Sequence, residues 1–151
     1  WEGYQLGSFD LSGARLGGAK LSGADLSGAD LPGANLQRCD LQNANLTKAN
    51  LQGCNLSGTK LCGADLSGAN LEAGDLQGCH LEQAQLLSAS AVRGCNFGAV
   101  AWEGYQLGSF DLSGARLGGA KLSGADLSGA DLPGANLQRC DLQNANLTKA
   151  N

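Results

Sequence analysis

The large apolar residues of this chain recur every five positions. Leu stands at every fifth position from Leu6 to Leu86, and after a single slip the same spacing resumes at Val92 and continues to Leu147. A period of five fits neither the 3.6-residue period of an α-helix nor the two-residue period of a β-strand. The pattern therefore predicts a structural unit five residues long that buries one large side chain.

The other slots of each five-residue unit also have a fixed character. A small residue, mostly Ala, stands two positions before each central Leu, and a polar residue stands one position before it. Gly often follows the Leu by two positions, as at Gly13 and Gly28. We expect the two apolar slots to face a core and the Gly slot to form a corner with positive φ. Gly at this frequency would cost an α-helix about 1 kcal/mol per residue.

Residues 24–28 (Ala-Asp-Leu-Ser-Gly) and 34–38 (Ala-Asn-Leu-Gln-Arg) resemble the A(D/N)LXX motif of the pentapeptide-repeat family. The resemblance covers essentially the whole chain. It implies an all-β fold, a right-handed quadrilateral β-helix with one pentapeptide on each face and four in each coil. Thirty pentapeptides then make about 7.5 coils, and a strand spacing of ~4.8 Å makes the rod roughly 36 Å long.

A much longer repeat contains the short one. Residues 1–50 recur unchanged as residues 102–151, so we expect one continuous solenoid over 1–151, with a full unit at 1–101 and half of an identical unit at 102–151. The 101-residue unit equals twenty pentapeptides plus one residue. We expect five whole coils and a one-residue bulge at a corner within 87–91. Each unit then returns to its starting face. The missing Met and the start at Trp1 suggest a piece of a longer polypeptide.

The repeat loses its regularity just after the slip. Trp102 takes a central slot, while Tyr105 and Phe110 take slots that elsewhere hold Ala. Two interpretations remain open. These rings form a structural joint between units, or they form an exposed aromatic surface that binds another molecule.

Carboxylates give the outer surface its one charge pattern. Four pentapeptides per coil would stack Asp10 with Asp30 on one face, and Asp25 with Asp65 on the adjoining face. The resemblance implies that such acidic faces can mimic duplex DNA and inhibit DNA gyrase. The alternative is a solvated ladder in which Asn side chains bond along the stack. A net charge of −4 and a pI near 4.8 argue against nucleic acid as a direct partner.

Candidate chemistry is sparse. The single His, His80, takes an outward slot without the nucleophile and orienting group that catalysis needs. None of the six Cys forms a C-x-x-C pair, and all except Cys62 take the small inward slot. A disulfide framework is the alternative to free thiols. However, Cys39 and Cys79 would lie two coils apart, roughly 9.6 Å, beyond disulfide reach. We therefore expect buried free thiols, no metal, no cofactor and no enzymatic activity.

The sequence thus predicts a non-enzymatic structural rod, part of a longer tandem array or an end-to-end filament, whose partner is itself. The alternative is a protein-binding module of the DNA-mimic type, directed at gyrase. Its candidate surface comprises Trp102, Tyr105, Phe110, Asp10, Asp30, Asp25 and Asp65. No apolar stretch is long enough for membrane insertion. A filament would suit the cell surface and a binding module the cytoplasm. The N-glycosylation triplets at Asn45, Asn55 and Asn146 are automatic products of the repeat.

Overall fold

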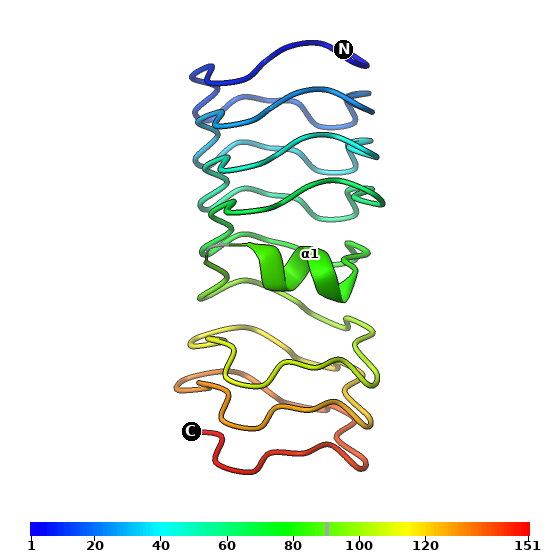
Figure 1. Cartoon of the computed structure of the whole chain (residues 1–151), viewed down its shortest axis with the longest axis vertical. Helices are drawn as coiled ribbons and strands as arrows, with labels where there is room; N and C mark the ends of the chain where they lie inside the picture. The colour runs from blue at the N-terminus through cyan, green and yellow to red at the C-terminus, as the bar shows by residue number, and fades with distance from the viewer. Residues whose placement is uncertain (90) are drawn as a thin grey trace.

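The computed structural model describes residues 1–89 and 91–151. The chain winds into a stack of similar coils that runs from the N-terminus at one end to the C-terminus at the other (Figure 1). One helix, α1 (Gln83–Ser88), interrupts the stack. In the described residues the coils are joined by isolated parallel β-bridges instead of longer strands.

The bridges define the register of the coils. Before α1 each bridge joins residues 20 positions apart, such as Asp10 with Asp30 and Asp25 with Asn45. Twenty residues are four pentapeptides, so each pentapeptide lies directly beside the one four units later. The bridged residue is the one directly before the central Leu or its equivalent, and it is polar except at Ala91 and Ala101. The polar slots therefore stack into columns along the outside of the coil.

Outside the coil that contains α1, the pentapeptides turn their corners by the same local geometry. The amide of the small residue donates to the carbonyl of the preceding central Leu, as from Ala24 to Leu21 at 3.0 Å. The residue two after the Leu has positive φ, for example 66° at Gly23. Gly adopts this conformation without steric cost, which explains its frequency there. The same conformation is imposed on Arg38 (φ 56°) and Lys48 (φ 58°).

The interior consists of the two slots that the sequence pattern selects. Leu36 and the small residue before it, Ala34, are both fully buried, and this arrangement repeats through the middle of the stack. Each coil bonds to the next through its central Leu, as in the 2.7 Å bond from the Leu26 amide to the Asn45 carbonyl. Burial and coil-to-coil pairing therefore come from the same repeated residue.

The extra residue of the 101-residue unit is accommodated differently from our expectation. The bridge spacing rises from 20 to 21 at Asn70–Ala91 and Asp75–Asn96, so one residue is added in this coil. We predicted a corner bulge within 87–91, a stretch in which Ser90 lies outside the described residues. The structure instead forms the helix α1 over Gln83–Ser88, so the predicted corner is wrong for residues 87 and 88 and is untested at Ser90. A helix rises only 1.5 Å per residue, less than half of an extended strand, so it holds more residues along one face.

The sequence of α1 explains why a helix forms at this point. Residues 82–87 (Glu-Gln-Ala-Gln-Leu-Leu) are good helix formers, without the Gly of neighbouring corners. Glu82 and Gln85 form a reciprocal capping box at its N-terminus. Gln85 is buried and its amide nitrogen donates to the carbonyls of Leu61 and Ala64, both at 2.7 Å. Leu86 remains fully buried, so the core continues through the helical coil.

Candidate interaction surfaces

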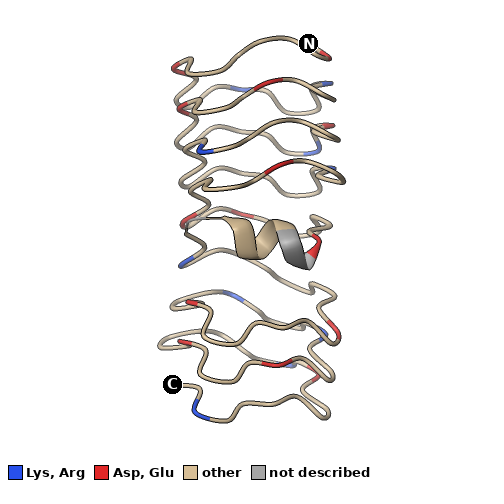
Figure 2. Cartoon of the chain, viewed as in Figure 1, with Lys and Arg blue, Asp and Glu red and all other residues tan. Residues whose placement is uncertain are grey.

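The predicted acidic residues lie in two adjoining columns. Asp10 bridges Asp30, and Asn45 bridges both Asp25 and Asp65. In this register the bridged slots of the two columns hold seven Asp and no Lys or Arg, and Figure 2 shows acidic positions recurring along the stack on both sides of α1. The seven are Asp10, Asp25, Asp30, Asp65, Asp111, Asp126 and Asp131. The other two columns mix both signs of charge, so the outer surface is asymmetric.

Local hydrogen bonds favour the ionised form of five of these seven carboxylates. An oxygen of Asp25 accepts the amide of Ser27, two residues on, at 2.9 Å. This bond and the Ser27 hydroxyl hold the pKa of Asp25 below its ordinary value. Side-chain and backbone bonds from Ser67 lower the pKa of Asp65 in the same way. The Asp-Leu-Ser triplet therefore stabilises both the corner and the negative charge.

Amide side chains link carboxylates along the columns. Asn50 donates through Nδ2 to Asp30 at 2.7 Å, and Asn96 donates to Asp75 at 2.9 Å. Lys60 lies 3.6 Å from Asp40 on another face. These contacts are those expected of a solvated polar ladder, the alternative to a recognition surface. They also relieve part of the repulsion between stacked carboxylates.

The aromatic residues after α1 pack mainly against one another. Trp102 is only 2% exposed and its ring centroid lies 4.7 Å from that of Phe97. Its place in our candidate interaction surface is therefore wrong, because the central slot points into the tube. Tyr105 is half-buried, stacks on Trp102 at 6.2 Å and donates its hydroxyl to the Leu81 carbonyl at 3.1 Å. Phe110 differs from Trp102 and Tyr105, because its side chain lines a pocket at the surface.

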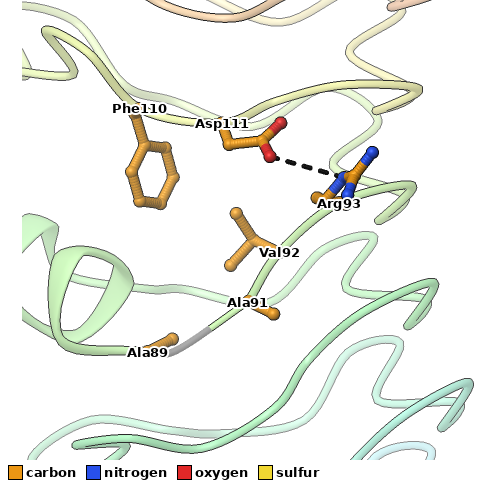
Figure 3. A pocket seen from close by; sticks show the side chains of 6 residues that line it. All are labelled: Ala89, Ala91, Val92, Arg93, Phe110 and Asp111. Atoms are coloured by element: carbon orange, nitrogen blue, oxygen red, sulfur yellow. Dashed lines mark ion pairs between the residues drawn. The ribbon is translucent and has the colours of Figure 1, made fainter.

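Phe110 lines a hollow on the side of the stack, which we call the side pocket. It has a volume of about 230 Å³, and Figure 3 shows the Phe110 and Val92 side chains pointing into it beside the Arg93–Asp111 ion pair. The six lining residues are Ala89, Ala91, Val92, Arg93, Phe110 and Asp111. Sequence reasoning missed this pocket. Its signal was Ala91 in a slot that normally holds a polar residue, near a Phe in a slot that normally holds Ala.

Most of the cysteines lie in the core of the stack. All six thiols are free, and Cys62 is exposed, as its slot predicts. The buried thiols donate to carbonyls of an earlier coil, as Cys54 does to Leu31 at 2.8 Å. Burial raises the pKa of Cys54 to about 11 and that of Cys95 to about 12. Over residues 1–89 and 91–151, no three metal-binding side chains come together.

The two ends of the stack expose apolar side chains. Trp1, Tyr4 and Phe9 are 57%, 62% and 56% exposed in the N-terminal coil, and Leu147 is 40% exposed in the C-terminal coil. Inside the stack, the counterparts of Trp1 and Leu147 (Trp102 and Leu46) are buried, and those of Tyr4 and Phe9 (Tyr105 and Phe110) are half-buried. The ends are therefore surfaces with the composition of a core.

The motif, the 20-residue register and the two-slot core define a pentapeptide-repeat solenoid. A sequence profile described as "Pentapeptide repeats (8 copies)" matches residues 10–47, 44–83, 64–98 and 111–151. The chain belongs to this family. Its members wind as right-handed β-helices and generally act as non-catalytic structural or binding modules.

Solved pentapeptide-repeat proteins align over most of the chain. HetL from the cyanobacterium Nostoc sp. strain PCC 7120, involved in regulating heterocyst differentiation, is 27% identical (99% of this chain, 87% of HetL, TM-score 0.45). Rfr23 from the cyanobacterium Cyanothece 51142 is 26% identical (98% and 87%, TM-score 0.37). Full-length QnrB1, a plasmid-mediated fluoroquinolone resistance protein, is 24% identical (97% and 83%, TM-score 0.46). No curated protein matches by sequence. Among the described residues, no helix has the length and apolar character to cross a bilayer.

Proposed function

We propose that this chain is a rigid, non-catalytic structural rod of about 7.5 coils that continues end to end. Continuation occurs into further 101-residue units of a tandem array or onto other copies of the chain. The observation that carries the proposal is the complementarity of the two ends. Each end presents the backbone groups and apolar side chains that the opposite end needs as partners.

The backbone pattern between coils makes the ends complementary. Each pentapeptide donates two amides to the following coil, as Leu6 does to Asp25 at 2.7 Å and Ser8 to Ser27 at 2.9 Å, and accepts one in return, from Asp25 to Tyr4 at 2.9 Å. An N-terminal edge therefore offers mainly carbonyls and a C-terminal edge mainly amides. Head-to-tail stacking satisfies both sets, while head-to-head stacking sets like groups against each other.

The length of the repeat unit supports concatenation. Coils contain 20 residues except the one with α1, where the bridge spacing is 21. A 101-residue unit thus corresponds to five coils and returns to its starting face. Successive units would keep their columns in register, so α1 and the side pocket would recur on one side of the rod. Stability in such solenoids grows by the addition of neighbouring coils.

Electron microscopy and sedimentation velocity of the purified chain test this proposal over a range of concentrations. We expect rods of constant width and varying length, and association that rises with concentration. Leu147→Lys should weaken association at least tenfold, because it charges the C-terminal edge. Leu87→Lys is the matched control, since Leu87 is similarly exposed (43% against 40%) but lies in α1 on the side of the stack. Monomers at every concentration would refute self-stacking.

A second candidate function is binding of a basic partner protein through the acidic columns, as a DNA mimic directed at gyrase. The observation that favours it is the segregation of seven Asp into two adjoining columns without Lys or Arg. Local hydrogen bonds also lower the pKa of Asp10 and Asp25, which keeps these groups charged. A gyrase supercoiling assay tests this candidate directly. Full activity in the presence of excess chain would eliminate it.

A further inference from the structure

We propose that the side pocket is a docking site for a segment of a partner protein in which an apolar side chain stands between basic ones. The site lies on the flank of the stack, so it does not depend on end-to-end assembly. It also differs from the rest of the acidic columns, because the surface at the side pocket contains an apolar hollow.

The repeat itself explains why the hollow is apolar. Ala91 stands in a bridged column slot, where its neighbour in the preceding coil is Asn70. Phe110 stands in a slot where the residue of the following coil, Ala130, is fully buried. The larger Phe110 ring is half-buried at the surface, next to the buried Val92. Ala91 in a normally polar slot and Phe110 in a slot that normally holds Ala thus create an apolar wall on an otherwise polar face.

The size of the pocket limits what can enter it. Small-molecule sites usually enclose about 300–1,000 Å³, whereas this pocket holds about 230 Å³. That volume suits a single leucine- or phenylalanine-sized side chain. Removing such a side chain from water is favourable where apolar atoms replace the water around it. An anchoring residue of a peptide segment therefore fits better than a cofactor.

The charged residues around the pocket determine which residues of the partner can stand beside its anchoring side chain. Arg93 Nε lies 3.4 Å from Asp111 Oδ2, so the cation among the six described lining residues already has an acidic partner. Asp131 bridges Asp111 in the same column, and Asp126 stands in the adjoining column. The Asp111 side chain is 46% exposed, and its Oδ1 also accepts the amide and the hydroxyl of Ser113. Lysine or arginine beside the anchor would meet these carboxylates, which supplies charge complementarity for a basic segment.

Two Ala positions give a matched pair of variants for the test. Ala91→Leu would fill the pocket from its own wall. Ala101→Leu makes the same change in the equivalent bridged slot of another face, because Ala101 bridges Lys121. Neither position is fully buried, so both variants should fold, as checked by their urea midpoints. Asp111→Asn removes one rim charge without changing shape.

The probe is a blocked pentapeptide with leucine between two pairs of lysines, titrated into the full chain and followed by NMR. We expect shifts at Ala89, Val92 and Phe110, and binding at least tenfold weaker in Ala91→Leu but unchanged in Ala101→Leu. Asp111→Asn should weaken binding about threefold. A peptide with glycine in place of leucine should bind at least tenfold more weakly. Absence of binding, equal binding of the glycine peptide, or full binding to Ala91→Leu would each overturn the proposal. The side pocket lies on the flank of the stack, so failure of end-to-end stacking would not affect these measurements.

Discussion

Residues 1–50 (the N-terminal repeat) and 102–151 (the C-terminal repeat) have the same sequence in different surroundings. Trp1 is 57% exposed, whereas its counterpart Trp102 is 2% exposed because the coil before it covers it. At the other end of the repeat the relation reverses. Leu36 is fully buried under the following coil, while its counterpart Leu137 is only partly buried. Identical residues thus gain a core environment only from an adjacent coil.

This comparison separates two sources of order in the chain. The corner geometry is the same in both repeats, with φ of 66° at Gly23 and 67° at its counterpart Gly124. Side-chain burial differs between them, so local conformation belongs to the pentapeptide and burial belongs to the stack. Substituting the same residue in each repeat measures the two contributions separately.

The largest difference is expected for the two Trp residues. Trp102→Ala should lower the free energy of unfolding by about 3–5 kcal/mol, because it removes a buried aromatic side chain. Trp1→Ala should cost less than about 1 kcal/mol, as usual for a surface substitution. Urea unfolding followed by circular dichroism measures both. Equal losses in the two variants would show that the first coil is covered in solution.

A smaller difference is expected for a central leucine. Leu36→Ala should cost about 2–5 kcal/mol, because the site is sealed between coils. Leu137→Ala should cost about half as much, since solvent already reaches the wild-type side chain and fills the space left. The same urea experiment applies. A larger loss at Leu137 than at Leu36 would contradict the burial that we describe.

Substitutions at the corners should lower the free energy of unfolding by the same amount in the two repeats. Gly23→Ala and Gly124→Ala each force a residue with Cβ into positive φ, at about 1–2 kcal/mol. No atom lies within 4 Å of the added Cβ at either position, so packing contributes nothing to the difference. Thermal unfolding of the pair tests this equality. Losses of stability that differ by more than about 1 kcal/mol would mean that neighbouring coils affect the energy of the corner conformation.

The smallest effect concerns acid. Ser27 and Ser128 lower the pKa of Asp25 and of its counterpart Asp126 below the ordinary value of 3.8. A depressed carboxyl pKa gives stability that is complete above that ordinary value and disappears as pH falls through the lower folded value. The urea midpoint should therefore fall slightly from about pH 4 to about pH 2. Asp25→Asn combined with Asp126→Asn should flatten this slope, because Asn does not titrate. The corner itself should survive, since Asn also accepts the corner amide, as Asn45 does from Thr47. An unchanged slope would rule out these carboxylates as its source.

Much of the architecture was predictable from residue spacing. The five-residue period identified the inward slots, as Leu36 and Ala34 show, and the resemblance supplied four pentapeptides per coil, which placed Asp10 beside Asp30. The period also revealed one extra residue but not the form it takes. A corner bulge and α1 both add a residue, and choosing between them depends on tertiary contacts such as those of Gln85 with Leu61 and Ala64.

The candidate surface was less predictable for a related reason. The residue type expected in a slot does not predict the position that a side chain too large for that slot adopts. Trp102 fits within the tube and is buried, whereas Phe110 is half-buried and borders the side pocket. The pocket combines residues about 20 positions apart, including Ala89 directly after a helix that the repeat pattern does not contain. Only the packed coils bring these features together.

Amide hydrogen exchange by NMR, with segmental labelling of the C-terminal repeat, tests most directly whether each coil is held by the next. The amides of Leu36, Leu41 and Leu46 donate to Asn55, Lys60 and Asp65 at 2.8–2.9 Å. Among the described residues, nothing accepts from the matching amides of Leu137, Leu142 and Leu147. In dilute monomer we expect the first three to exchange more than about tenfold more slowly than their sequence-identical counterparts. Equal exchange rates in the two sets would contradict the stacked-coil account.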